Sequence, residues 1–334
     1  MFLSAMSLLA GIALLIKGAD WLVEGGTSIA RKLRISDLVI GLTIVSFGTS
    51  APELLVNIVA SLRGSAAIAI GNIVGSNIAN ALLILGVAAM VRPLAVQRST
   101  VFKEIPFCLL ASITLFVMAN DALVDGLSSS VLSRSDGIAF LGFFIIFLYY
   151  TFGIRHNHSD GEAEVHTEEK RSLWISTFLV IIGCIALALG GQFSVDGAQS
   201  IALRIGVSEA LVGITVIAVG TSLPELVTSI TAALKGNTDI AVGNVVGSNI
   251  FNIFWILGIS AIIKPLPFQP SVNPDLIMVI VSVILLFIFV HTGRVRDRLF
   301  FWWRTAEGHM IARWEGAILL AIYVVYIAYV AWRG

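Results

Sequence analysis

The sequence contains little charge. Only 13% of its 334 residues are Asp, Glu, Lys or Arg, while 57% are hydrophobic and the mean hydropathy is +0.94. Soluble domains carry roughly 25% charged residues, so this composition excludes a soluble globular chain. The 21 basic and 21 acidic residues cancel, and a net charge of zero gives no support to nucleic-acid binding.

Cysteine is also scarce. The two cysteines, Cys108 and Cys184, both lie in apolar runs, where cysteine usually serves as a small packing residue. No Cys/His cluster is present that would hold zinc or copper. No Ser/His dyad, zinc motif or aspartate pair stands at a catalytic spacing, so we expect neither an enzyme nor a bound cofactor.

Long apolar stretches make up most of the chain. A helix needs about 20 apolar residues to cross a bilayer, and continuous runs of this kind favour helices over a barrel. The sequence therefore predicts an all-α polytopic membrane protein with ten transmembrane helices, at roughly 2–22, 38–62, 68–90, 103–119, 137–154, 173–192, 210–234, 240–262, 275–292 and 313–332.

One segment occurs twice. Residues 41–86 and 213–258 are identical at 25 of 46 positions without a gap, at a constant offset of 172. The offset continues upstream, where Ser28 matches Ser200, so the repeat is a whole half of the chain. We predict a first repeat, 1–154, a polar linker, 155–171, and a second repeat, 172–334. Because each half has an odd number of spans, the second must insert upside down, as in secondary transporters with inverted repeats.

Basic residues are distributed unevenly among the predicted loops. With the N-terminus outside, the cytoplasmic connections hold 15 of the 21 Lys and Arg residues and the external ones hold five. Lys and Arg concentrate on the cytoplasmic side of membrane proteins. We therefore expect a protein of the plasma (inner) membrane with both termini outside and the linker in the cytoplasm.

Each copy of the segment places a glutamate in the middle of an apolar span. Glu53 follows Gly-Thr-Ser-Ala-Pro, and Glu225 follows Gly-Thr-Ser-Leu-Pro. Proline has no amide hydrogen and interrupts a helix, and the carbonyls that this frees must line a cavity rather than face lipid. A carboxylate inside a membrane is costly and is functional by default.

Further oxygen donors lie in the same two motifs. In each copy the next span carries a Ser and an Asn four residues apart, on one face of a helix. Hard oxygen ligands suit Ca²⁺ and Na⁺, and suit Mg²⁺ less well. Two carboxylates in a poorly solvated site repel each other, so protons are expected to compete with the metal. The predicted ligands are Glu53, Glu225, Thr49, Thr221, Ser50, Ser222, Ser76, Ser248, Asn80 and Asn252.

The pattern GTSxPE followed by GNxxGSNxxN, present twice, resembles the α-repeats of the calcium/cation antiporter superfamily, and most closely those of its prokaryotic sodium/calcium exchangers. The resemblance implies that Na⁺ entry drives Ca²⁺ out, and that the first and sixth spans slide against the other eight. It implies Ca²⁺ binding by Glu53 and Glu225, ligands from Thr49 and Thr221, and Na⁺ sites completed by Ser50, Ser76, Ser222 and Ser248 and by the carbonyls of Ser46 and Ala218.

Two alternatives within transport remain open, a Ca²⁺/H⁺ antiporter and a K⁺-dependent Na⁺/Ca²⁺ exchanger. Asn252 disfavours the second, because an Asp at its position goes with K⁺ dependence in one branch of the superfamily. The GNxxE-type motif of proton-coupled relatives is absent, which favours Na⁺. The expected partners are Ca²⁺, Na⁺, competing protons and membrane lipid, the last at the arginine-rich aromatic segment 294–304.

Overall fold

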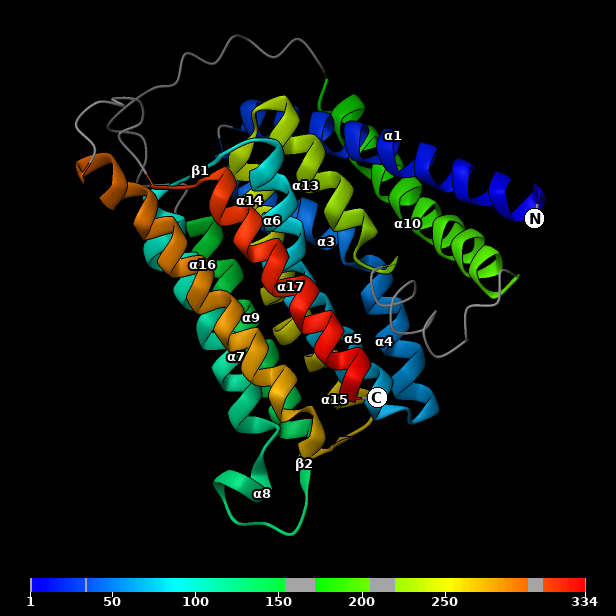
Figure 1. Ribbon diagram of the computed structural model, residues 1–334, viewed down its shortest axis with the longest axis vertical. Coiled ribbons are helices and arrows are strands. Elements are labelled where there is room, and N and C mark those ends of the chain that lie inside the picture. The colour runs from blue at the N-terminus through cyan, green and yellow to red at the C-terminus, as the bar shows by residue number, and fades with distance from the viewer. Residues whose placement is uncertain (1, 34, 154–171, 205–219, 300–308, 334) are drawn as a thin grey trace.

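The computed structural model describes residues 2–33, 35–153, 172–204, 220–299 and 309–333. It is mostly helical, as predicted (Figure 1). Within the described residues, eight helices are long and apolar enough to cross a membrane. A ninth span is obtained if Asp37–Thr49 and Ala51–Arg63, which meet at a bend of 48°, are counted as one. The first part of the predicted seventh span and the linker 155–171 lie outside the described residues.

The two longest helices, α1 (Phe2–Leu33) and α10 (Leu173–Arg204), lie side by side along the edge of the molecule (Figure 1). They run antiparallel, because Ser4 of α1 contacts Ser200 at 2.8 Å and Ser28 contacts Ser176 at 2.7 Å. Glycines allow this close approach: a Cβ added to Gly18 would lie 2.9 Å from the backbone nitrogen of Leu187.

Both helices extend about three turns beyond the predicted spans 2–22 and 173–192. The added residues are more polar, which made them resemble loops in the sequence. Packing between the two helices keeps them helical, since Gly25 of α1 lies against Ser176 and Gly197 of α10 against Leu8.

The second span is broken where proline predicted a break. Its first part consists of α2 (Asp37–Ile40), the π-helical η1 (Gly41–Val45) and α3 (Ser46–Thr49). After Ser50, which leaves the helical conformation at φ −83° and ψ 7°, α4 (Ala51–Arg63) begins with Pro52 in its first turn. The described part of the seventh span, α13 (Leu223–Lys235), begins in the same way after Ser222.

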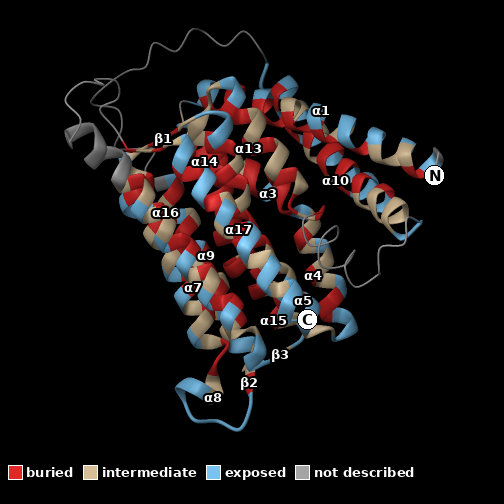
Figure 2. Cartoon of the chain, in the orientation of Figure 1, coloured by how far each residue is buried: buried red, intermediate tan, exposed pale blue. Residues whose placement is uncertain are grey.

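The third and eighth spans form the centre of the molecule. The third consists of α5 (Ala66–Ile78), the π-helical η2 (Ala79–Ile84) and α6 (Leu85–Val91). The eighth consists of α14 (Thr238–Ile250), the π-helical η6 (Phe251–Leu257) and α15 (Gly258–Ile263). Within each, 78% of an 18-residue stretch is buried, against 22–39% in the other spanning helices (Figure 2). Any site on these two spans is therefore enclosed by protein.

The remaining helices surround this centre. The fourth and fifth spans are η3 (Thr100–Glu104, π-helical) with α7 (Ile105–Met118), and α9 (Arg134–Gly153), with the short α8 (Asp121–Val124) between them. The predicted ninth and tenth spans correspond to α16 (Asn273–Leu299), preceded by the 3₁₀ turn η7 (Pro270–Val272), and to α17 (Arg313–Arg333).

Two short antiparallel sheets, which the sequence did not predict, join loops from the two halves. Strand β1 (Leu94–Val96) pairs with β4 (His309–Ile311), and β2 (Ser130–Leu132) pairs with β3 (Leu266–Phe268). Three-residue strands carry too little periodicity to be recognised in a sequence. The prediction of a mostly helical protein is therefore confirmed, but these loops contain strands that it did not include.

Candidate cation-binding site

Glu53 and Glu225 occupy matching places at the two helix breaks. Each lies in the first turn of the helix that follows a break, α4 or α13, and each side chain is only 1% exposed. The N-terminus of a helix carries partial positive charge, which favours a carboxylate there. The charge of Glu225 acts on Glu53, so the two carboxylates share one electrostatic environment.

Two serine hydroxyls of the first half contact the two carboxylates. The Ser50 hydroxyl donates to Glu225 Oε1 at 3.0 Å, and its oxygen lies 3.1 Å from Ser248 Oγ. The Ser76 hydroxyl donates to Glu53 Oε1 at 3.4 Å. The structure thus brings Ser50 and Ser76 to the carboxylates, and Ser248 to Ser50.

The end of α3 is held against α14 of the other half. The Thr49 hydroxyl donates to Asn244 Oδ1 at 3.0 Å, and the Ser46 hydroxyl donates to the Asn244 carbonyl at 3.0 Å. The Ser46 carbonyl, a predicted ligand, accepts from the Ser50 amide at 3.0 Å and lies 3.3 Å from the Thr49 hydroxyl oxygen. Because the single Thr49 hydrogen is directed to Asn244, this carbonyl keeps a second lone pair for a cation. Ala218 lies outside the described residues.

Four asparagines connect the central spans in a reciprocal pattern. Asn80 Nδ2 donates to Asn249 Oδ1 at 3.0 Å, and Asn252 Nδ2 donates to Asn77 Oδ1 at 2.9 Å. Asn77 and Asn249 also donate to each other's carbonyls, at 3.2 and 3.3 Å. When each residue is exchanged for its equivalent 172 positions away, each of these bonds becomes the other bond of its pair. Sequence reasoning singled out Asn80 and Asn252 but missed Asn77, Asn249 and Asn244, although all three belong to the doubled motif.

Six buried oxygens around this network have no hydrogen-bond partner within the described residues. A buried polar atom without a partner is costly and calls for an explanation. Carboxylate, amide and hydroxyl oxygens are the ligands that Ca²⁺ and Na⁺ accept, so the donor set fits such a cation. These atoms are Glu53 Oε2, Glu225 Oε2, Asn80 Oδ1, Asn252 Oδ1, Thr221 Oγ1 and Ser222 Oγ.

The part of the chain that the structure describes contains no group of three or more His, Cys, Asp or Glu residues suited to a metal. This result excludes a zinc-type cluster from those residues. A site formed by two carboxylates and neutral oxygens is compatible with it, because only two of its ligands are charged.

The described contacts around the site differ between the two halves. On α14, Gly243 and Gly247 are buried against Leu38 and Leu42 of the broken second span. At the equivalent place on α5, Gly71 is exposed. The same difference appears at the serines: Ser50 donates to a carboxylate, whereas the Ser222 hydroxyl has no partner. Segments α2, η1 and α3 therefore cover α14 beside the site.

Helix α10 lies across both helix breaks. Gly48, in the first break, contacts the Cys184 sulfur, and Gly220, in the second, contacts the Val195 side chain. Because glycine has no side chain at either point, α10 approaches the backbone of both broken spans directly. A displacement of α10 would expose the breaks.

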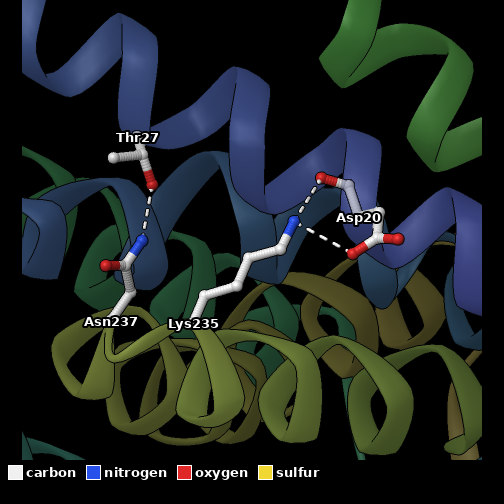
Figure 3. Close-up of polar contacts among 4 residues, drawn as sticks. All are labelled: Asp20, Thr27, Lys235 and Asn237. Atoms are coloured by element: carbon white, nitrogen blue, oxygen red, sulfur yellow. Dashed lines mark hydrogen bonds and ion pairs between the residues drawn. The ribbon is translucent and has the colours of Figure 1, made fainter.

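Helix α1 is joined to the bundle near the turn between α13 and α14 (Figure 3). Lys235 Nζ lies 2.9 Å from Asp20 Oδ1, and Asn237 Nδ2 donates to Thr27 Oγ1 at 2.8 Å. Gln192 occupies the position equivalent to Asp20, and it donates to Asp196 of its own helix instead. Arg63 occupies the position equivalent to Lys235, and it forms no ion pair of this kind within the described residues. We call these two contacts the α1 latch.

The comparisons with known proteins agree with this arrangement. The profile of the family described as "Sodium/calcium exchanger protein" matches residues 3–153 and 175–332. The chain is 34% identical to the sodium/calcium exchanger MaX1 of Methanosarcina acetivorans, over 96% of both chains. It is 35% identical to the inner membrane protein YrbG of Escherichia coli, over 99% of this chain and 98% of that one.

Solved structures show the same fold. A structure of the sodium-calcium exchanger NCX_Mj soaked with Na⁺ and Ca²⁺ superposes with a TM-score of 0.79 at 34% identity, covering 98% of each chain. The family consists of transporters rather than enzymes, and its members are integral membrane proteins. The chain therefore belongs to the sodium/calcium exchanger family, in the prokaryotic branch of the calcium/cation antiporter superfamily.

Proposed function

We propose that this protein is an antiporter that exchanges Na⁺ for Ca²⁺ across the inner membrane by alternating access. The observation that carries the proposal is the pair Glu53 and Glu225, each buried with one oxygen unpartnered and surrounded by neutral oxygens of both halves. Two ionised carboxylates give the site a charge of about −2, which one Ca²⁺ or two Na⁺ would neutralise. Because the two ions compete for the same oxygens, binding of one promotes release of the other.

The contact pattern supports two inverted five-helix repeats. The serine contacts Ser4–Ser200 and Ser28–Ser176 exchange with each other under a shift of 172 residues, and they join antiparallel helices. The reciprocal asparagine bonds have the same property. A two-fold axis that relates antiparallel elements lies in the membrane plane, which is the geometry of inverted repeats. We infer ten spans in two repeats, 1–154 and 172–334.

The different conformations of the two halves support alternating access. Two copies of one sequence that adopt different local structures can exchange those structures, and the exchange would open the other end of the site. Movement of α1 and α10 over the helix breaks is the motion that this requires, since α10 contacts both break glycines, Gly48 and Gly220. From the distribution of Lys and Arg, we place both termini outside and residues 155–171 in the cytoplasm.

The test is a flux measurement on purified protein reconstituted into liposomes. We expect Ca²⁺ uptake into the liposomes that requires Na⁺ inside, persists with a protonophore and does not depend on K⁺. Uptake that proceeds without Na⁺ and collapses with the protonophore would identify a Ca²⁺/H⁺ antiporter. Uptake that requires K⁺ together with Na⁺ would identify the K⁺-dependent type.

A further inference from the structure

A series of three hydrogen bonds connects α13, α14 and α3 beside the candidate site. The Ser229 hydroxyl donates to the Ala241 carbonyl at 3.4 Å, and Asn244 Nδ2 donates to Ser229 Oγ at 3.0 Å. The Thr49 hydroxyl donates in turn to Asn244 Oδ1 at 3.0 Å. The side chains of Ser229, Asn244 and Thr49 are each 0% exposed, so these bonds are shielded from solvent.

The partners of Asn244 determine which way its amide points. Its Nδ2 group lies 3.0 Å from the Ser229 hydroxyl oxygen and 3.4 Å from the Glu225 carbonyl oxygen. A carbonyl accepts hydrogen bonds and never donates them, so the amide nitrogen has to lie on this side. The amide oxygen is therefore directed toward Thr49, where it accepts the hydrogen of the threonine hydroxyl.

This orientation decides what the Thr49 hydroxyl offers to a cation. A hydroxyl has one hydrogen and two lone pairs. Because Asn244 accepts the hydrogen, the lone pairs remain available to an ion, and so does one lone pair of the Ser46 carbonyl, which lies 3.3 Å from the same hydroxyl oxygen. Without the Asn244 acceptor, the hydrogen would turn toward the Ser46 carbonyl or toward the ion, and either orientation would weaken ion binding.

The first half of the chain contains the same series of bonds except for the last one. Asn57 Nδ2 donates to the Ala69 carbonyl at 3.0 Å, and Asn72 Nδ2 donates to Asn57 Oδ1 at 2.7 Å. Each of these residues lies 172 positions before its equivalent in the second half. The third bond, from Thr221 to Asn72, is absent within the described residues, where the buried Thr221 hydroxyl has no partner. The two series therefore differ at a single bond.

An exchange of conformations between the halves would move that bond from one half to the other. We propose that Asn244 and Asn72 are positioning residues of the exchanger, each of which turns the hydrogen of a threonine away from the ion in one of two conformations. The ion is the Na⁺ or Ca²⁺ of the proposed exchange, on which this role rests. Asn244 acts on Thr49 in the conformation described here. Asn72 acts on Thr221 after the halves exchange conformations.

The first test is a double-mutant cycle between Asn244 and Thr49, with Ca²⁺ binding to the purified protein as the measurement. Asn244→Leu and Asn244→Asp both keep the volume of asparagine, but only Asn244→Asp retains an acceptor for the Thr49 hydrogen. We expect Thr49→Val to lower Ca²⁺ affinity about 10-fold or more in the wild type and in Asn244→Asp, because it removes a contact between a hydroxyl and a charged group.

In Asn244→Leu, where the Thr49 hydroxyl is no longer oriented, Thr49→Val should change the Ca²⁺ affinity less than about twofold, within the scatter of independent sites. Thr221→Val is the matched control, because Thr221 is not the partner of Asn244, and it should have the same effect in the wild type and in Asn244→Leu. An equal loss of affinity on Thr49→Val in all three backgrounds would overturn the proposal.

The second test uses Asn72, which is only half-buried, so that it decides the proposal even where Asn244→Leu does not fold. In liposomes that hold the protein in one orientation, the half-saturating Ca²⁺ concentration for flux is measured from each side of the membrane. Asn72→Leu should raise this concentration at one side, and Asn244→Leu should raise it at the opposite side. An increase at the same side for both variants, or no increase for Asn72→Leu at either side, would overturn the proposal.

The two experiments also separate the role of the asparagines from the proposed function. Wild-type protein that binds no Ca²⁺ would contradict the exchange of Na⁺ for Ca²⁺, and the same cycle measured with Na⁺ would then decide whether Asn244 acts through Thr49. Ca²⁺ binding with additive effects of the Asn244 and Thr49 substitutions would instead contradict the positioning role and leave the proposed function in place.

Discussion

The Ser50 hydroxyl donates a hydrogen bond of 3.0 Å to the carboxylate of Glu225, across the boundary between the two halves of the chain. The reverse contact, from Ser222 to Glu53, is absent among the described residues, and the Ser222 hydroxyl has no partner. Two residues that are equivalent in sequence therefore have different roles in this conformation.

This difference predicts unequal effects of two equivalent substitutions. Ser50→Ala should lower the stability of the ion-free protein by about 1.5–3 kcal/mol, because it removes a hydrogen bond to a charged group. Ser222→Ala removes a hydroxyl without a protein partner and should leave that stability within about 0.5 kcal/mol. The measurement is denaturation in detergent without Na⁺ or Ca²⁺. Equal losses in the two variants would show that the asymmetry is not a property of the ion-free state.

The two carboxylates are predicted to be indispensable for Ca²⁺ binding. Glu53→Gln and Glu225→Gln each remove one of the two charged ligands while keeping side-chain volume. Loss of one partner of a buried charged contact costs about 2–5 kcal/mol, which is at least about 30-fold in affinity. We expect each variant to insert in the membrane but to lose Ca²⁺ transport in liposomes. Near-normal flux in either would show that the carboxylate does not bind the ion.

Cys184 offers a chemical test of the contact between α10 and the first helix break. Its thiol is half-buried against Gly48, whereas Cys108, the other cysteine, is 2% exposed. A maleimide on Cys184 would separate α10 from the break, so labelling should stop Ca²⁺ flux in proportion to modification, as followed by mass spectrometry. Cys184→Ser is the control, active and insensitive to the reagent. Complete labelling with normal flux would contradict the contact.

The α1 latch should affect conformation more than stability. The side chains of Lys235 and Asp20 are 37% and 35% exposed, and such pairs contribute about 0–1 kcal/mol. Lys235→Gln combined with Asn237→Ala should therefore change the Ca²⁺ exchange rate by up to about fivefold with little change in melting temperature. Arg63→Gln, at the position equivalent to Lys235, should leave the rate unchanged. An equal effect of Arg63→Gln would show that the latch is not specific to one end.

Local sequence patterns predicted the parts of the site that depend on local structure. Pro52 interrupts its helix whatever the tertiary fold, and a glutamate beside it in an apolar run indicates a functional site. The contact of Thr49 with Asn244 and the reciprocal asparagine bonds join residues far apart in sequence, so their partners could not be read from either motif alone.

The sheet formed by β1 and β4 has a consequence for the order in which the protein is made. Strand β1 is synthesised after the third span, but its partner β4 directly precedes α17, the last helix. During synthesis, β1 must wait with its backbone groups unpaired until almost the whole chain has left the ribosome. One face of the protein is therefore completed only when its final helix enters the membrane, so a chain truncated before β4 cannot complete that face.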